Sequence, residues 1–138
     1  MRRAGTTALA AIAALGVAGC GGGGVSDKQK IETTVRDYFG AFADGNAAKA
    51  CSDLSTTTRE DFVKAARAKD CSSALAKAMQ RPDIKRFTAR LRNPQVVSVA
   101  INGGSATAQV RALGRTTKVP LHKEGDNWKV EGKVGESG

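Results

Sequence analysis

The chain has few aromatic side chains and little of the chemistry that metal centres and nucleophilic catalysis require. Phe, Trp and Tyr make up 4% of its 138 residues, and it has one histidine. A single histidine, and three cysteines without a C-x-x-C spacing, argue against a metal site. The sequence has neither a G-x-S-x-G motif nor a phosphate-binding loop. We therefore expect no catalytic residue of these kinds, no metal and no cofactor.

Long apolar runs are also scarce, and the one that exists lies at the N-terminus. Apolar residues make up 41% of the chain, but 23 of them are alanine. The length fits one ordinary domain and is too short for two domains with good cores. We expect a single globular unit with a thin core.

The first nineteen residues resemble a secretory signal. Met1-Arg2-Arg3 is basic, and the apolar segment from Ala8 to Ala18 would rise about 16 Å as a helix, far short of the roughly 30 Å hydrocarbon core of a membrane. The string Val17-Ala18-Gly19-Cys20 resembles the bacterial lipobox. This resemblance implies cleavage after residue 19 and a lipid on Cys20. The alternative is an ordinary signal peptide with a chance cysteine near the cut.

Residues 20–26 are expected to form a tether, because four consecutive glycines follow Cys20. Such a tether would hold the domain close to the membrane in which the lipid is inserted. The predicted location is therefore the extracytoplasmic face of the cell membrane, with the protein anchored by lipid. Loss of Arg2 and Arg3 reduces the net charge from +9 to +7, so the exported part stays basic.

Cys51 and Cys71 remain as a pair once Cys20 is assigned to the lipid. An exported chain meets an oxidising environment, so we expect them to form a disulfide. Closing a loop of this length stabilises a fold by about 3 kcal/mol. The alternative is two free, buried thiols.

Helical patterns fill the first part of the domain, which is expected to span residues 27–133. Ser26-Asp27-Lys28-Gln29 fits a capping box, and an apolar stripe follows at Ile31, Val35, Phe39 and Phe42. Asp44-Gly45-Asn46 predicts the end of this helix and the cap of the next. Further helices are predicted to begin near Thr58 and Cys71, and a short one follows Pro82. Asp53 is expected either to cap a helix or to face water.

From Gln95 onward the apolar pattern has a period of two, which predicts strands. Asn102-Gly103-Gly104 predicts the turn of one hairpin and Glu124-Gly125-Asp126-Asn127 the turn of a second. In the first hairpin, alternation predicts a common face for Val97, Val99 and Ile101. In the second, the expected inner face consists of Thr117, Val119, Leu121, Trp128 and Val130. Helices followed by a meander predict an α+β domain, with the N-terminal helices packed on an antiparallel sheet. Residues 134–138 are expected to be a tail.

Two segments resemble the nuclear transport factor 2-like superfamily, and in particular its small exported actinobacterial lipoproteins. They read V-R-D-Y-F-G-A-F-A-D-G-N-A-A-K-A-C over residues 35–51 and V-P-L-H-K-E-G-D-N-W-K-V-E-G over residues 119–132. The resemblance implies a cone formed by a curved sheet around the first helix. In this family the cone interior is a ligand pocket, an active site or filled core, and the fold does not choose among them.

Such a cone would place Tyr38, Phe39, Phe42 and Trp128 around a pocket. Tyr38 is close enough to the apolar stripe to point inward, although a buried tyrosine with a satisfied hydroxyl is the simpler interpretation. His122 alternates with Val119 and Leu121, so it should face outward. No second titratable group is visibly placed beside these residues, as acid–base catalysis would require.

The densest charge in the chain is a basic run with only Asp83 against it, formed by Arg81, Lys85, Arg86, Arg90 and Arg92. Between these cations, Ile84, Phe87 and Leu91 predict an apolar stripe held on the domain. The run is either a solvated face or a contact for anionic lipid or wall polymer. A single aromatic residue in this segment argues against nucleic acid as a partner.

These observations predict a non-enzymatic surface lipoprotein that binds an envelope protein or a small apolar ligand. The alternative is a small isomerase, dehydratase or hydrolase-like enzyme that uses Tyr38 in the cone.

Overall fold

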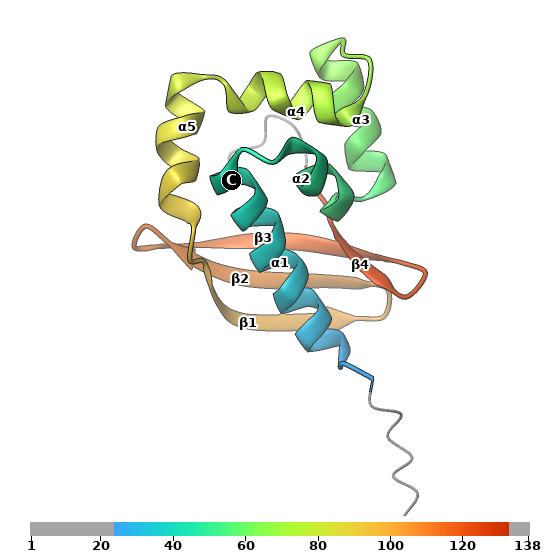
Figure 1. Ribbon diagram of the computed structural model, residues 1–138. Helices are drawn as coiled ribbons and strands as arrows, with labels where there is room; N and C mark the ends of the chain where they lie inside the picture. The colour runs from blue at the N-terminus through green and yellow to red at the C-terminus, as the bar shows by residue number, and fades with distance from the viewer. Residues whose placement is uncertain (1–23, 133–138) are drawn as a thin grey trace, which may run out of the picture.

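The computed structural model describes residues 24–132, and Cys20, the segment before it and the tail after residue 133 lie outside this range. The helical part contains α1 (Asp27–Asp44), α2 (Ala47–Asp53), α3 (Thr56–Ala66), α4 (Cys71–Met79), α5 (Pro82–Thr88) and the short 3₁₀ helix η1 (Ala89–Leu91). The strands β1 (Gln95–Asn102), β2 (Ser105–Ala112), β3 (Arg115–Glu124) and β4 (Asn127–Val130) follow. Figure 1 shows the helices on one side of the sheet, with α1 crossing the strands diagonally.

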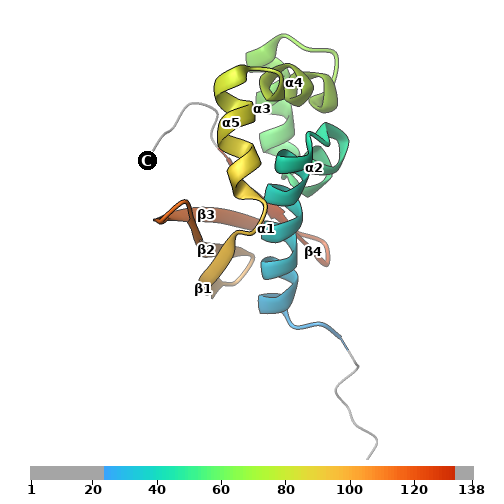
Figure 2. The same ribbon diagram turned by 60° about the vertical axis from the view of Figure 1, so that its left-hand side comes forward.

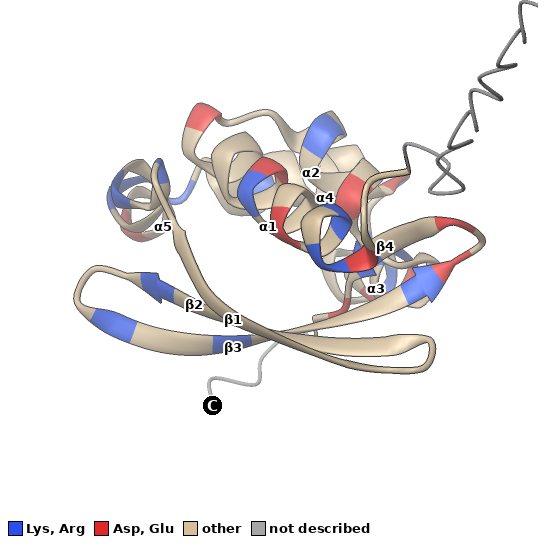
Figure 3. Cartoon of the chain, turned by 90° about the horizontal axis from the view of Figure 1, so that it is seen from below, with Lys and Arg blue, Asp and Glu red and all other residues tan. Residues whose placement is uncertain are grey.

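The sheet is an antiparallel meander in which each strand pairs with the next along the chain. It is twisted and curved, as the view from below shows (Figure 3). The register places Ala108 between Val99 and Val119, so these side chains share the face toward the helices. Both hairpin turns predicted around Gly103 and Gly125 are present. A third turn, at Leu113-Gly114, joins β2 to β3.

The core lies between α1 and the sheet and continues between α2 and α4, and side chains occupy this space. Its largest fully buried members are Trp128, Ile31, Leu54, Leu75 and Leu121. The turned view shows α2 to α5 above one end of α1, with no described helix over the other face of the sheet (Figure 2). The predicted α+β class, with N-terminal helices on a curved antiparallel sheet, is confirmed.

Local capping explains where the helices begin and end. Ser26 and Gln29 form the predicted capping box at the start of α1, and Gly45 adopts a left-handed conformation at its end. The side chain of Asn46 then caps α2. Helix α3 begins at Thr56, two residues before the predicted start, because the Ser55 side chain accepts a hydrogen bond from the backbone of Thr58.

The predicted disulfide between Cys51 and Cys71 is present, with a Cα–Cα distance of 6.0 Å. It joins α2 to the first turn of α4. No described helix is long and apolar enough to cross a membrane.

The strands depart from simple alternation of buried and exposed residues at three positions. A bulge between Val96 and Ser98 breaks the alternation of β1, so Val96 and Val99 pack on the core while Val97 is exposed. Ile101 keeps the inner-face register but is also exposed, on the edge strand. Thr117 lies in the inner register opposite Val110, yet it is exposed near the β2–β3 turn.

Candidate functional site

A cleft of about 410 Å³ lies between the first half of α1 and the hairpin of β3 and β4. We call it the α1–β4 cleft. Its walls carry charged groups of both signs, hydroxyl groups, an amide and the only tryptophan of the chain. The lining residues are Val25, Lys30, Thr33, Thr34, Asp53, Asp126, Asn127, Trp128 and Lys129.

One end of the cleft is built by the contact between the first turn of α1 and Trp128. The capping box fixes the start of α1, and the Asp27 carboxylate accepts a hydrogen bond from the indole Nε1 of Trp128 at 3.1 Å. Lys123 Nζ lies 3.2 Å from the same carboxylate and 5.7 Å from the centre of the indole ring. The hydrogen bond from Trp128, and then the one from Lys123, lower the pKa of Asp27 below its usual value. Asp27 is therefore a carboxylate at neutral pH and holds the tryptophan in place.

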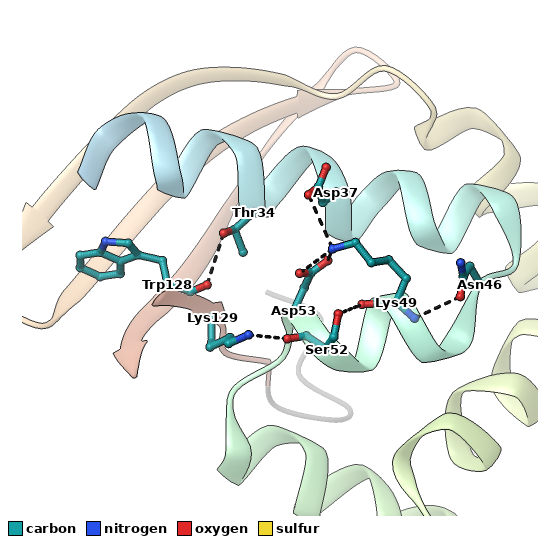
Figure 4. A network of polar contacts seen from close by, with 8 residues as sticks. All are labelled: Thr34, Asp37, Asn46, Lys49, Ser52, Asp53, Trp128 and Lys129. Atoms are coloured by element: carbon teal, nitrogen blue, oxygen red, sulfur yellow. Dashed lines mark hydrogen bonds and ion pairs between the residues drawn. The ribbon is translucent and has the colours of Figure 1, made fainter. Parts of the chain in front are cut away.

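Further side-chain-to-backbone contacts join the walls. Thr34 Oγ1 donates to the Trp128 carbonyl oxygen at 3.3 Å, and Lys30 Nζ donates to the Asp126 carbonyl oxygen at 3.4 Å. Lys129 Nζ reaches the Ser52 carbonyl oxygen at 2.6 Å, which connects β4 to α2 (Figure 4). These contacts fix the width of the cleft through three different elements.

An ion cluster lies where α2 meets α1. Lys49 Nζ donates to both carboxylate oxygens of Asp53 at 3.0 Å and lies 3.6 Å from Asp37 Oδ2 (Figure 4). Burial raises the pKa of Asp53, while its hydrogen bonds to Lys49 act in the opposite direction. Partial burial acts to lower the pKa of Lys49, but the hydrogen bonds and charges of Asp53 and Asp37 together outweigh this and raise it. The sequence predicts that Asp53 either caps a helix or faces water. This prediction is wrong, because Asp53 is buried and paired with Lys49.

Burial of Asp53 comes from β4, which lies far away in sequence. The residue after Asp53, Leu54, forms an isolated parallel bridge with Val130, and the backbone N–H of Ser55 donates to the Val130 carbonyl oxygen at 2.9 Å. This bridge brings the end of α2 against the last strand. The i, i+4 spacing of Lys49 and Asp53 is the one local signal that indicates the pair.

The aromatic residues expected around a pocket behave in two ways. Trp128 lines the α1–β4 cleft. Tyr38 instead packs edge-on against Phe39 and Phe42, with ring centres 5.5 and 4.9 Å apart, and none of these three rings lines the cleft. Burial, followed by the negative charge of Asp53, raises the pKa of the Tyr38 hydroxyl. It stays protonated at neutral pH, so it is a poor general base.

A second cleft, of about 340 Å³, lies beside the disulfide between α3 and α4. Thr56 and Glu60 lie on one wall and Cys71 on another. Arg59 also borders it, and its Nε is a buried nitrogen without a hydrogen-bond partner among the described residues. The other end of the same guanidinium donates to Thr56 Oγ1 at 3.2 Å, so this side chain serves mainly to close the N-terminus of α3.

Other predicted positions lie away from both clefts. His122 is exposed, as expected from the alternation of β3. Within residues 24–132, no group of three or more His, Cys, Asp or Glu side chains could hold a metal ion.

The basic run forms α5, η1 and the start of the link to β1. Its cations Arg81, Lys85, Arg86, Arg90 and Arg92 are all exposed. The apolar stripe predicted between them is wrong in one position. Leu91 is buried and Ile84 half-buried, but Phe87 is 54% exposed because only one side of this short helix meets the domain.

Comparison with known proteins adds one structural likeness. No protein-family model and no curated protein matches the chain. One similar solved structure is a Campylobacter jejuni protein whose proposed description is a nuclear transport factor 2-like transpeptidase. The two chains are 17% identical, with a TM-score of 0.43 over 72% of this chain and 95% of the other.

Proposed function

We propose that this chain is a lipid-anchored, extracytoplasmic binding protein whose α1–β4 cleft takes a small, hydroxyl-rich ligand. The observation that carries the binding role is the cleft itself, with two threonines and amino and amide groups converging on one space. Its location rests on the lipobox-like string ending at Cys20, and the disulfide fits an oxidising compartment.

A polar ligand suits the geometry better than an apolar one inside the cone. The space between α1 and the sheet holds buried side chains such as Ile31, Leu54 and Leu121. The α1–β4 cleft, in contrast, opens at the surface beside Val25 and carries several free hydrogen-bonding groups. Lys30 and Lys129 each make one hydrogen bond to a carbonyl, which leaves donors for a ligand.

Binding without catalysis also fits the state of the titratable groups. Asp53 is held by Lys49, Asp27 is held by Trp128 and Lys123, and the Tyr38 hydroxyl has a raised pKa. A general base needs a pKa near the working pH and an open path to the substrate. The two carboxylates are engaged in holding elements together, so we assign them a structural role.

The only tryptophan gives a direct test of the cleft. Titration of residues 21–138 with N-acetylglucosamine oligosaccharides, as hydroxyl- and amide-bearing probes, should change the fluorescence of Trp128 in a saturable way. Thr34→Val removes a hydroxyl from the cleft wall and should weaken the response at least several-fold. Thr57→Val, on the exposed side of α3, is the matched control and should leave it unchanged. Equal responses of the two variants, or no saturable response to any of the sugars, would reject this ligand class.

The anchor is tested separately by the mass of the processed chain. Expressed in a bacterial host with lipoprotein processing, the chain should begin at Cys20 and carry a diacylglyceryl group. Cys20→Ser should release the protein into the medium or leave an uncleaved precursor. Normal processing of Cys20→Ser, with unchanged membrane association, would reject the anchor and leave the cleft proposal standing.

A further inference from the structure

A second charged surface lies at the end of the molecule opposite the start of α1. Helix α5 and the β2–β3 hairpin lie at this same end in all three views (Figures 1, 2 and 3). The register confirms the neighbourhood, because Gln95, just after the basic run, pairs with Arg111 on β2. We call this surface the basic end. It consists of the exposed cations of residues 81–92 together with Arg111, Arg115 and Lys118.

Most of the charge at the basic end is uncompensated. Arg81 pairs with Asp83 at 3.0 Å and Arg92 with Asp44 at 3.2 Å, and all four side chains are more than 60% exposed. The other six cations form no ion pair with any residue of the described range, 24–132. They are Lys85, Arg86, Arg90, Arg111, Arg115 and Lys118. Such a concentration of one sign attracts an extended anionic partner.

Two large apolar side chains protrude among these cations. Phe87 on α5 is 54% exposed, and Leu113 at the tip of the β2–β3 hairpin is 46% exposed. Leu113 has a φ of +55° and Gly114 a φ of +73°, in a two-residue turn that usually selects Asn, Asp or Gly. Leucine is strained in this conformation. The fold gains little from this residue at this position, which points to an intermolecular contact.

We propose that the basic end docks on an anionic lipid surface, with Phe87 and Leu113 entering the interface and the cations meeting the headgroups. A lipid surface accommodates both features, because apolar side chains enter the acyl boundary while Lys and Arg stay among anionic headgroups. An anionic polymer would bind the cations but leave the side chains of Phe87 and Leu113 exposed to water. A protein interface is disfavoured because Phe87 and Leu113 lie on separate elements and are surrounded by cations. The core of a protein interface is, in contrast, depleted of charge.

The test uses residues 21–138, which contain every described element, together with vesicles and sedimentation. Binding to vesicles of phosphatidylglycerol mixed with phosphatidylcholine should exceed binding to pure phosphatidylcholine at least tenfold. It should also fall steeply as salt is raised. Lys85→Gln with Arg86→Gln and Arg90→Gln should reduce it about tenfold. The control is Lys28→Gln with Lys64→Gln and Lys69→Gln. It has the same net charge as the first variant but alters exposed cations away from the basic end. It should reduce binding less than threefold.

A second pair of variants tests the apolar tips. Leu113→Asn places a residue that suits the turn at the hairpin tip, so the melting temperature should stay the same or rise while vesicle binding falls several-fold. Ile101→Ser removes an exposed apolar side chain from the opposite end of β1, near the turn at Gly103, and should leave binding unchanged. Three results would overturn the proposal. These are equal binding to neutral vesicles, equal losses in the two charge variants, and tight binding of heparin or polyglutamate without binding of vesicles.

Discussion

The two ends of this domain use lysine and arginine in opposite ways. Around the α1–β4 cleft, Lys49 and Lys123 pair with carboxylates, while Lys30 and Lys129 donate to carbonyl oxygens of neighbouring elements. We call this region the paired end. At the basic end, six cations have no ion pair in the described part of the chain. The same residue types therefore hold the fold together at one end and remain available to a partner at the other.

This contrast shows why net charge alone says little about function. A composition of 22 basic against 13 acidic residues predicts an anionic partner but does not say where it binds. The structure separates cations that are engaged from cations that are free. Substitutions at the paired end should therefore change stability, and substitutions at the basic end should change binding.

The largest expected effect is on the disulfide, because it holds the helix that carries Lys49 and Asp53. Cys51→Ala with Cys71→Ala should lower the free energy of unfolding by about 2–4 kcal/mol. Urea denaturation of residues 21–138 measures this, and the wild-type protein in reductant should match the variant. A loss below about 1 kcal/mol would mean that packing alone holds α2 on α4.

The next largest effect is expected from Lys49→Met, which leaves the carboxylate of Asp53 without its partner. An unpaired buried polar group costs about 1–3 kcal/mol, and we expect the lower half of this range because Lys49 itself is partly exposed. Adding Asp53→Asn should restore much of the loss. Lys28→Met, on an exposed part of α1, is the control. Equal stability of Lys49→Met and the control would show that the cluster contributes nothing.

A smaller and pH-dependent effect is expected at Asp27. Its folded pKa lies below the ordinary aspartate value of about 3.9 because Trp128 and Lys123 hydrogen-bond the carboxylate. The stabilisation is present above that value and is lost as the pH falls through the lowered folded pKa. Asp27→Asn should therefore melt below wild type at pH 7, and the difference should shrink toward pH 2.5. A gap between Asp27→Asn and wild type that stays constant over this pH range would contradict the assignment.

The smallest effect is expected at the basic end. Lys85→Gln with Arg86→Gln and Arg90→Gln should change the free energy of unfolding by no more than about 0.5 kcal/mol, because these side chains contact solvent. Thermal melting checks this. A loss above about 1 kcal/mol would mean that these cations stabilise the fold, as the cations at the paired end do, and would remove the distinction between the two ends.

Local sequence signals predicted the elements well because their causes are local. The capping box at Ser26, the left-handed Gly45 and the glycines of two hairpin turns each act within a few residues. The disulfide could also be predicted from the sequence, because an exported chain with one cysteine assigned to the lipid leaves a single pair of cysteines. Errors arose where the environment is set by distant segments. Val97 is exposed because of the bulge in β1, and Phe87 is exposed because only one side of α5 meets the domain.

The candidate sites were harder to predict from the sequence, because they too depend on segments that are far apart in the chain. Asp27 and Trp128 are 101 residues apart, and Asp53 is buried by a strand that ends at Val130. Arg111 and Lys118 look like ordinary outward positions of two strands, and Arg115 directly follows the turn between these strands. Only the placement of their hairpin beside α5 joins them to the basic run.

The contact between α1 and β4 also sets the order in which the domain can be completed. The strands β1 to β4 can form as successive local hairpins, which close quickly because their loops are short. The first helix, in contrast, meets its partner Trp128 only after about a hundred further residues have been made. A chain that emerges N-terminus first, whether from a ribosome or from a translocation channel, therefore holds α1 without its partner until the last strand is out. The closing step joins the two ends of the domain, and until then the part of α1 that packs on β4 stays exposed to whatever accompanies the emerging chain.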